Sequence, residues 1–364
     1  MVRVLHVLNN LGSGGAENFV LNIYRNIDRC KVQFDFLIRS NQNGSMIDEI
    51  KQLGGNVYIL PAFPRYTIKN YYELNRFLKN NYNNYVAIHV HANALIYVKP
   101  LQLAKKYGIP VRIIHSHSTS SKLKSIHYFN CKKIDRWITD RFACSDLAGQ
   151  WMFQNRQYKI IPNGINLEKF TFDEKHRKLI RKMYKIENKT VVGHVGRFTQ
   201  PKNHNFIISV FEEYHKENQN SALLLIGDGE DKDKVKELVK KKGLEESVIF
   251  CGATTEVYRY YSAMDIFLFP SLFEGLPVVL VEAQAAGLPC FVSDTVDKTV
   301  DFGGNMQFLP LGQPDAWADA VCGSPLARAQ DALERTRDAG YDIRTTAAKL
   351  QQFYLTEYEH APAR

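Results

Sequence analysis

Short apolar runs alternate with amphipathic stretches along this chain, and the alternation runs through twice. Such alternation is typical of β-α-β units, in which helices join the parallel strands of one sheet. In the first half, the expected strands are 3–8, 32–38, 57–60, 86–90 and 111–114. In the second half, they are 190–195, 222–226, 248–251, 266–269 and 290–292. The pattern therefore predicts an α/β protein made of two Rossmann-like halves.

The boundary between the two halves is expected in the charged stretch 168–189. We expect a first domain over 1–168 and a second over 169–344, followed by an amphipathic C-terminal helix over 345–364. The composition changes near Lys298, since only one lysine follows it while Ala, Arg and Asp dominate. This change is compatible with a native or a recombined C-terminus.

Composition limits the partners and the compartment. The chain of 364 residues has a net charge of +9, which favours anionic partners such as a nucleotide, a phosphate, a membrane surface or a nucleic acid. It contains no apolar run of about 18 residues, and its first strand is followed too soon by polar residues for a signal peptide. The six cysteines show no zinc spacing. We therefore expect reduced thiols and a cytoplasmic location, at the inner face of the cell membrane if the acceptor is lipid-linked.

Two glutamates separated by seven residues, Glu274 and Glu282, stand in the sequence SLFEGLPVVLVEAQ. Pro277 suits the first turn of a helix, so a helix is expected to start near 275–278 and to end at about Ala286. The free N–H groups at that start can bind an anion such as a phosphate. Carboxylates accept hydrogen bonds from sugar and ribose hydroxyls. Taken alone, the segment is compatible with a phosphate site flanked by two carboxylates, and equally with one surface glutamate and one glutamate on a helix face.

Two further segments follow predicted strands. The sequence LGSGGAE places Gly14 and Gly15 where the first strand turns into a helix, and glycine lets such a turn approach a ligand closely. The sequence VGRFTQPKN places Arg197 and Lys202 at the carboxyl end of the first strand of the second half. Ligands collect at this edge of an α/β sheet, and two cations there can neutralise a diphosphate.

These segments resemble motifs of retaining glycosyltransferase family 4, which has the two-domain GT-B fold. The motifs follow one another in the family's order and span almost the whole chain. The resemblance implies two Rossmann-like domains that face one another across a cleft, with the C-terminal helix crossing back to the first. It implies that Glu274 contacts the donor sugar, Glu282 the ribose, and Arg197 with Lys202 the diphosphate. It also implies donor-site positions at Gly14, Gly15, Gly227, Gly229, Gly275 and Leu276. The likeness is closest to bacterial capsule and exopolysaccharide transferases.

Two H-x-H pairs, His89/His91 and His115/His117, end neighbouring strands of the first half, and each pair lies on one face of its strand. Four imidazoles could ligate a metal, which leaves open a metal-dependent hydrolase or lyase. The family resemblance instead places His91 against the reacting sugar and His117 near the acceptor. His6 is expected to be structural. Asp231-Lys-Asp233 imitates a D-x-D metal motif but falls at a helix start, so we expect no metal.

Basic and apolar residues interleave in segment 122–142, which suits the headgroup boundary of an anionic membrane. The alternative is a solvated loop followed by an amphipathic core helix. The basic members are Lys122, Lys124, Lys132, Lys133, Arg136 and Arg141, and the apolar members are Leu123, Ile126, Phe129, Trp137 and Phe142.

Together these observations predict a retaining glycosyltransferase. It would move a sugar from a nucleotide-sugar, with UDP as the expected nucleotide, to a hydroxyl of a saccharide or lipid-linked saccharide. The setting would be cell-surface polysaccharide synthesis, with no cofactor and no nucleic-acid partner. Besides the hydrolase or lyase, the remaining alternative is a non-catalytic nucleotide-binding protein.

Overall fold

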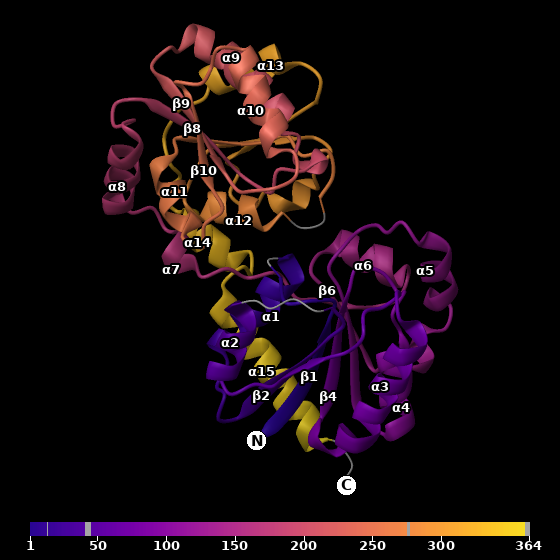
Figure 1. The fold of residues 1–364 in the computed structure, drawn as a ribbon. Helices are drawn as coiled ribbons and strands as arrows, with labels where there is room; N and C mark the ends of the chain where they lie inside the picture. The colour runs from indigo at the N-terminus through magenta and orange to yellow at the C-terminus, as the bar shows by residue number, and fades with distance from the viewer. Residues whose placement is uncertain (13, 41–44, 275–276, 361–364) are drawn as a thin grey trace. The chain divides into compact units, whose positions relative to one another are not determined.

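The computed structural model describes residues 1–12, 14–40, 45–274 and 277–360. The chain divides into two compact units (Figure 1). The first unit combines Met1–Gly164 with Asp342–Arg364, and the second unit is Ile165–Tyr341. The sequence had placed these boundaries at 168/169 and 344/345.

The described part of the first unit contains a seven-stranded parallel sheet in the order β3-β2-β1-β4-β5-β6-β7. β2 is buried along its whole length, as expected for a strand covered on both faces. The strands are β1 (Val2–Leu8), β2 (Val32–Ile38), β3 (Val57–Ile59), β4 (Ala87–Ala92), β5 (Val111–Ser116), β6 (Asp140–Ala143) and β7 (Lys159–Ile160). The helices are α1 (Gly15–Asn26), α2 (Ser45–Gln52), α3 (Thr67–Asn81), α4 (Lys99–Tyr107), α5 (Lys124–Cys131), α6 (Asp146–Phe153) and α15 (Ile343–Glu359), with the 3-10 turns η1 (Tyr82–Asn84) and η2 (Ile134–Arg136).

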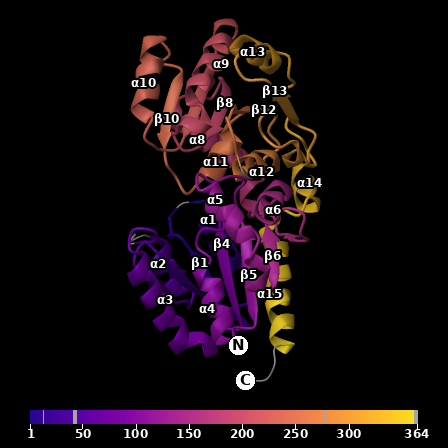
Figure 2. The same cartoon turned by 90° about the vertical axis from the view of Figure 1, so that its right-hand side faces the viewer.

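The C-terminal helix α15 belongs to the first unit, where it runs alongside the sheet and packs on α1, β1 and β2 (Figures 1 and 2). Asp342 caps its start, because the carboxylate accepts a hydrogen bond of 2.9 Å from the Arg344 backbone N–H. Ala347, Leu350 and Tyr354 are buried in the same core as the strands. The last segment of the chain thus completes the core of the first unit.

The described part of the second unit contains a six-stranded parallel sheet in the order β10-β9-β8-β11-β12-β13. One apolar cluster surrounds Tyr261 and Phe267, and another surrounds Phe211 and Trp317. The strands are β8 (Thr190–Val195), β9 (Ser221–Ile226), β10 (Val248–Gly252), β11 (Ile266–Phe269), β12 (Cys290–Ser293) and β13 (Met306–Leu309). The helices are α7 (Leu167–Phe170), α8 (Glu174–Tyr184), α9 (His204–Glu217), α10 (Lys232–Lys241), α11 (Val257–Ala263), α12 (Val278–Ala285), α13 (Pro314–Cys322) and α14 (Ala332–Asp338), with the 3-10 turns η3 (Gln200–Lys202) and η4 (Lys298–Val300).

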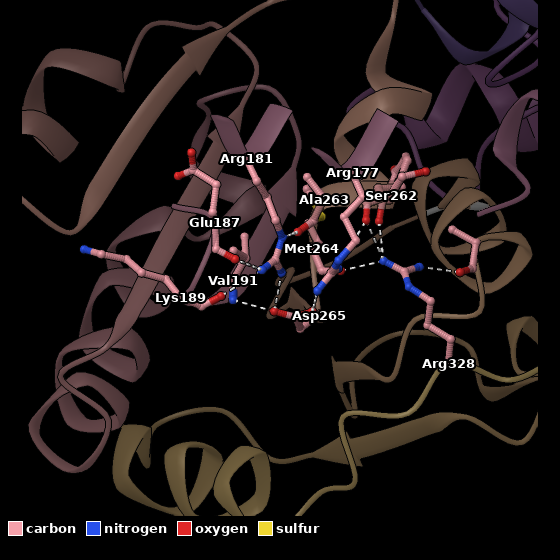
Figure 3. Close-up of polar contacts among 12 residues, drawn as sticks. Arg177, Arg181, Glu187, Lys189, Val191, Ser262, Ala263, Met264, Asp265 and Arg328 are labelled. Atoms are coloured by element: carbon pink, nitrogen blue, oxygen red, sulfur yellow. Dashed lines mark hydrogen bonds and ion pairs between the residues drawn. The ribbon is translucent and has the colours of Figure 1, made fainter. Parts of the chain in front are cut away.

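Three arginines converge on the turn that joins α11 to β11 (Figure 3). The Asp265 carboxylate accepts hydrogen bonds from Arg177 at 2.7 Å and from Arg181 at 2.6 Å, which fixes α8 against the sheet. Arg328 donates to the backbone carbonyls of Tyr261 and Ala286, at the ends of α11 and α12. Charge-assisted bonds to carbonyls thus fix two helices whose side chains enter the candidate site.

Candidate functional site

The loop that follows β8 is held in place by two glycines of the loop that follows β9. Gly227 has a φ of +144°, and a Cβ at this position would lie 2.0 Å from the carbonyl oxygen of Gly196. A Cβ at Gly229 would lie 2.4 Å from the carbonyl oxygen of Phe198. Because any side chain would push the loops apart, these glycines permit the contact that positions the exposed Arg197.

Lys202 and Glu274 form an ion pair at the carboxyl end of the six-stranded sheet. The Lys202 ammonium donates to Glu274 Oε1 at 2.6 Å, and both side chains are largely buried. The same ammonium lies 4.9 Å from the ring centre of Phe269, the last residue of β11. The structure thus brings together two residues that the sequence had assigned separately to diphosphate and sugar. Gly275 and Leu276, which the sequence also assigned to this site, lie outside the described residues.

Glu282 lies on α12, and the hydroxyl of Tyr261 on α11 donates to its Oε2 at 2.8 Å. Burial raises the pKa of Glu282 to about 7, although the Tyr261 hydrogen bond acts in the opposite direction. Burial, followed by the neighbouring Glu282 carboxylate, raises the pKa of Tyr261 well above its usual range. Glu282 is therefore poised to change its charge near neutral pH. Sequence reasoning missed Tyr261, which belongs to none of the motifs of the sequence analysis.

The helix that follows Glu274 begins at Val278, with Pro277 as its N-cap residue. Pro277 makes no side-chain capping bond, so N–H groups of the first turn remain available to an anion. The observed start lies within the predicted range of 275–278, and the helix ends at Ala285, one residue before the predicted end.

Two buried histidines that sequence reasoning missed lie next to Lys202. His194 Nδ1 donates to the Leu268 carbonyl at 2.8 Å, and the His204 ring stacks on Phe198 with 4.0 Å between ring centres. Burial, assisted by the Lys202 charge, lowers the pKa of His204 to about 4, and burial lowers the pKa of His194 well below its usual range. Both rings are therefore neutral near pH 7.

In the first unit, Gly14 is the N-cap residue of α1 and Gly15 its first residue. A Cβ at Gly14 would lie 2.3 Å from Glu17 Oε2, whereas none of the described residues comes within 4 Å of a Cβ at Gly15. The Glu17 carboxylate is the end of a flexible side chain and can move aside, so neither glycine is required by packing alone.

Both H-x-H pairs meet in the first unit, because β4 and β5 pair with His91 opposite His115. His91 Nδ1 lies 2.9 Å from His117 Nε2, and His89 Nε2 lies 3.2 Å from His115 Nδ1. His6, expected to be structural, also bonds to His91, at 3.0 Å.

The Tyr354 hydroxyl of α15 lies 2.7 Å from His89 Nδ1, a contact that nothing in the sequence pattern indicated. By contrast, Asp231 is the N-cap residue of α10 and pairs with Lys234 at 2.8 Å, as expected for a helix start.

Comparisons with known proteins agree with this geometry. The model of glycosyltransferase family 4 matches residues 13–169, and that of the glycosyl transferases group 1 matches residues 176–321. The chain is 33% identical to the putative glycosyltransferase EpsF of Bacillus subtilis, over 98% of each chain. It is 23% identical to the capsular polysaccharide biosynthesis glycosyltransferase CapH of Staphylococcus aureus, over 98% of this chain and 99% of the other. The structure of HepE from Anabaena in complex with UDP and glucose superposes with a TM-score of 0.78 at 19% identity, over 98% of this chain and 100% of that chain.

The two parallel sheets and these comparisons define a glycosyltransferase with the GT-B fold, as the sequence had predicted. The chain belongs to the family whose halves are glycosyltransferase family 4 and glycosyl transferases group 1. The comparisons give no support to the alternative of a metal-dependent hydrolase or lyase.

Proposed function

We propose that this enzyme transfers a hexosyl or hexosaminyl group from a UDP-sugar, with retention at the anomeric carbon, in cell-surface polysaccharide synthesis. The acceptor is a hydroxyl group of a saccharide or a lipid-linked saccharide. The observation that carries this proposal is the Lys202–Glu274 pair at the sheet edge where α/β proteins bind ligands. Glu282 lies on α12, the helix that follows this pair in the chain. The UDP and glucose in the HepE complex and the capsular role in the name of CapH support it.

In this proposal, Arg197 and Lys202 bind the diphosphate, and the N–H groups at the start of α12 add to its stabilisation. Glu282 accepts hydrogen bonds from the ribose hydroxyls, and Glu274 orients the donor sugar through its own hydroxyls. Lys202 is then attracted to both the diphosphate and Glu274. The ion pair keeps the ammonium and the carboxylate in place before the donor arrives, so little side-chain ordering remains for binding.

The chemical step breaks the bond between the anomeric carbon and the leaving phosphate oxygen. It forms a bond from the acceptor oxygen to the same face of that carbon, and the acceptor proton passes to the departing phosphate. Negative charge grows on the diphosphate, where Arg197 and Lys202 provide positive charge. His91 is proposed to face the donor sugar and His117 the acceptor, and the charge stabilisation requires no metal ion.

Exposed apolar side chains on α5 support a peripheral contact with an anionic membrane, which a lipid-linked acceptor would require. Phe129 is 58% exposed and Leu123 is 47% exposed, and the Lys133 ammonium lies 3.8 Å from the Phe129 ring centre. The predicted surface was wrong for Phe142, which is buried because β6 is a strand inside the sheet. No helix within the described residues is long and apolar enough to cross a membrane.

The direct test of the proposed function is UDP binding by calorimetry. Lys202→Ala and Arg197→Ala should each weaken UDP binding by tenfold or more, because a charge-assisted contact contributes about 1.5–3 kcal/mol. The matched control is Lys234→Ala, which removes an exposed lysine paired with Asp231 in the same unit. Its UDP affinity should equal that of the wild type. Unchanged affinity in both site variants would refute the diphosphate assignment.

Transfer itself is tested by incubating the enzyme with a panel of UDP-sugars and saccharide acceptors and analysing the anomeric configuration of the product. UDP binding without transfer to any acceptor would favour the non-catalytic nucleotide-binding alternative. An inverted product would refute retention while leaving the donor site intact.

A further inference from the structure

Five histidines from three neighbouring strands gather in the described part of the first unit. β1 pairs with β4 so that His6 stands opposite His89, and β4 pairs with β5 so that His91 stands opposite His115. Each ring of the cluster has at least one histidine neighbour with ring centres 4.2–5.4 Å apart. The cluster consists of His6, His89, His91, His115 and His117.

His6, His89, His91 and His115 are buried, and burial disfavours the charged form of an imidazole. A neutral imidazole is the form in which histidine ligates a metal.

Several ring nitrogens of the cluster have no hydrogen-bond partner among the described residues. They are His6 Nε2, His115 Nε2 and His117 Nδ1, and each is buried. A buried polar atom without a partner is costly, because it has lost its hydrogen bonds to water. A metal ion bound through His115 Nε2 would remove this cost at that atom.

Among the described residues, two groups of three histidines bring their ligand atoms within 4.8 Å of one another. The inner triad is His6, His89 and His91, and the outer triad is His91, His115 and His117. The outer triad is the more accessible because His117 is partly exposed, whereas His6 and His89 of the inner triad are buried. His91 is common to both triads, and His115 is buried.

The dimensions of the outer triad suit a tetrahedral ion. Zn–N bonds of about 2.0–2.1 Å place two ligand nitrogens roughly 3.4 Å apart. The observed separation of His91 Nδ1 and His117 Nε2 is 2.9 Å. In the free protein these two nitrogens share one hydrogen bond, so one of them carries the proton. That ring must change its tautomer, and the pair must separate by about 0.5 Å, before both nitrogens ligate the ion.

We propose that His91, His115 and His117 bind Zn²⁺ or a similar divalent d-block ion, and that this ion inhibits sugar transfer. Ligands made only of imidazole favour such ions over Mg²⁺ and Ca²⁺, which prefer oxygen. The inhibition rests on the proposed function, in which His91 faces the donor sugar. An imidazole whose lone pair is bound to a metal cannot also accept a hydrogen bond from the sugar.

The site is tested by titrating ZnCl₂ into the EDTA-treated, dialysed full-length protein in a calorimeter. We expect one Zn²⁺ per chain with micromolar or tighter affinity, and no binding of Mg²⁺ at the same concentrations. His115→Asn and His117→Asn should each weaken Zn²⁺ binding at least tenfold. The matched control is His204→Asn, which changes a buried histidine of the other unit whose ring nitrogens also lack partners among the described residues. It should bind Zn²⁺ as the wild type does.

Melting temperatures identify any variant that fails to fold. Because two site variants are made, the test can still be carried out if one of them does not fold. Zn²⁺ should raise the melting temperature of the wild type and have little effect on that of either folded site variant. The site is overturned if the wild type does not bind Zn²⁺, or if the folded site variants bind it as tightly as His204→Asn does.

Inhibition is measured separately, with a UDP-sugar that the enzyme turns over. Zn²⁺ should halve the wild-type rate at a concentration near its Kd, and EDTA should restore the rate. The residual activity of His117→Asn should respond to Zn²⁺ only at concentrations about tenfold higher. Binding without inhibition would overturn the inhibitory role. If no UDP-sugar is turned over, the proposed function fails, whereas the calorimetric result still decides the metal site.

Discussion

The raised pKa of Glu282 makes UDP binding pH-dependent if this carboxylate binds the ribose. A protonated carboxyl accepts hydrogen bonds less well than a carboxylate, so the ionised form should bind the ribose hydroxyls more tightly. With a pKa of about 7 in the free enzyme, Glu282 is mostly protonated at pH 6 and mostly ionised at pH 8. UDP affinity should therefore rise with pH across this range.

The magnitude follows from the ionised fraction of Glu282. For a pKa of about 7, this fraction is roughly one tenth at pH 6 and roughly nine tenths at pH 8. If only the ionised form binds ribose, UDP affinity should fall about tenfold from pH 8 to pH 6, which equals about 1.4 kcal/mol. Near pH 7, binding should release about half a proton per UDP, because the bound state holds Glu282 ionised.

The stability of the free enzyme should respond with the opposite sign. Between the ordinary pKa of 4.5 and the folded pKa of about 7, the folded chain retains a proton that the unfolded chain has lost. The contribution of Glu282 to the free energy of unfolding therefore falls as the pH rises through this window. UDP binds more tightly at pH 8, so the increase in melting temperature that a fixed, high UDP concentration produces should be larger at pH 8 than at pH 6.

The assay is isothermal calorimetry of UDP binding from pH 6 to pH 8, in pairs of buffers with different heats of ionisation. Glu282→Gln is the control, since it keeps the shape of the side chain and cannot titrate. The ionisation of UDP itself affects both proteins equally, so the difference between them isolates Glu282. Identical pH profiles and identical proton release in the two proteins would refute the ribose assignment.

Three further predictions concern other parts of the molecule. His91→Ala should slow transfer while UDP affinity stays near the wild-type value, and wild-type activity should survive EDTA; loss of activity on chelation would contradict this. Asp265→Ala leaves the buried Arg181 without its carboxylate and should lower the free energy of unfolding by about 3–5 kcal/mol. The control is Asp331→Ala, which breaks an exposed ion pair and should lower the free energy of unfolding by less than about 1 kcal/mol. Both values are measured by chemical denaturation. Vesicles with anionic lipid should sediment the protein at low salt and less at high salt, and Phe129→Ser should weaken this; equal sedimentation with neutral vesicles would contradict it.

Much of the fold could be predicted because it depends on local patterns. Apolar runs bounded by polar turns marked β1, β2, β8 and β9 in the sequence. Sequence reasoning missed β6, β7 and β13. β7 has two residues, both exposed, and β6 begins with the charged pair Asp140–Arg141, so neither has the apolar run that marks a strand.

Residues of the candidate site could be nominated from the sequence, but not their contacts. Lys202 and Glu274 lie 72 residues apart and meet because β8 and β11 are neighbours in the sheet. Tyr354 reaches His89 across 265 residues, from a helix that follows the whole second unit. The order of the strands in a sheet and the packing of α15 on the first unit are properties of the tertiary structure. No local spacing in the sequence could indicate these contacts.

The return of α15 to the first unit has a consequence for how the protein is made. The ribosome delivers residues 1–164 first, then the whole second unit, and only then the helix that carries Tyr354. Until then, β1 and β2 lack the Ala347–Leu350–Tyr354 surface that buries them, and His89 lacks its hydroxyl partner. The nascent first unit therefore exposes apolar surface while the second unit is being made. It reaches its native core only once α15 has been synthesised, so the synthesis of the second unit is a period of exposure to chaperones and proteases.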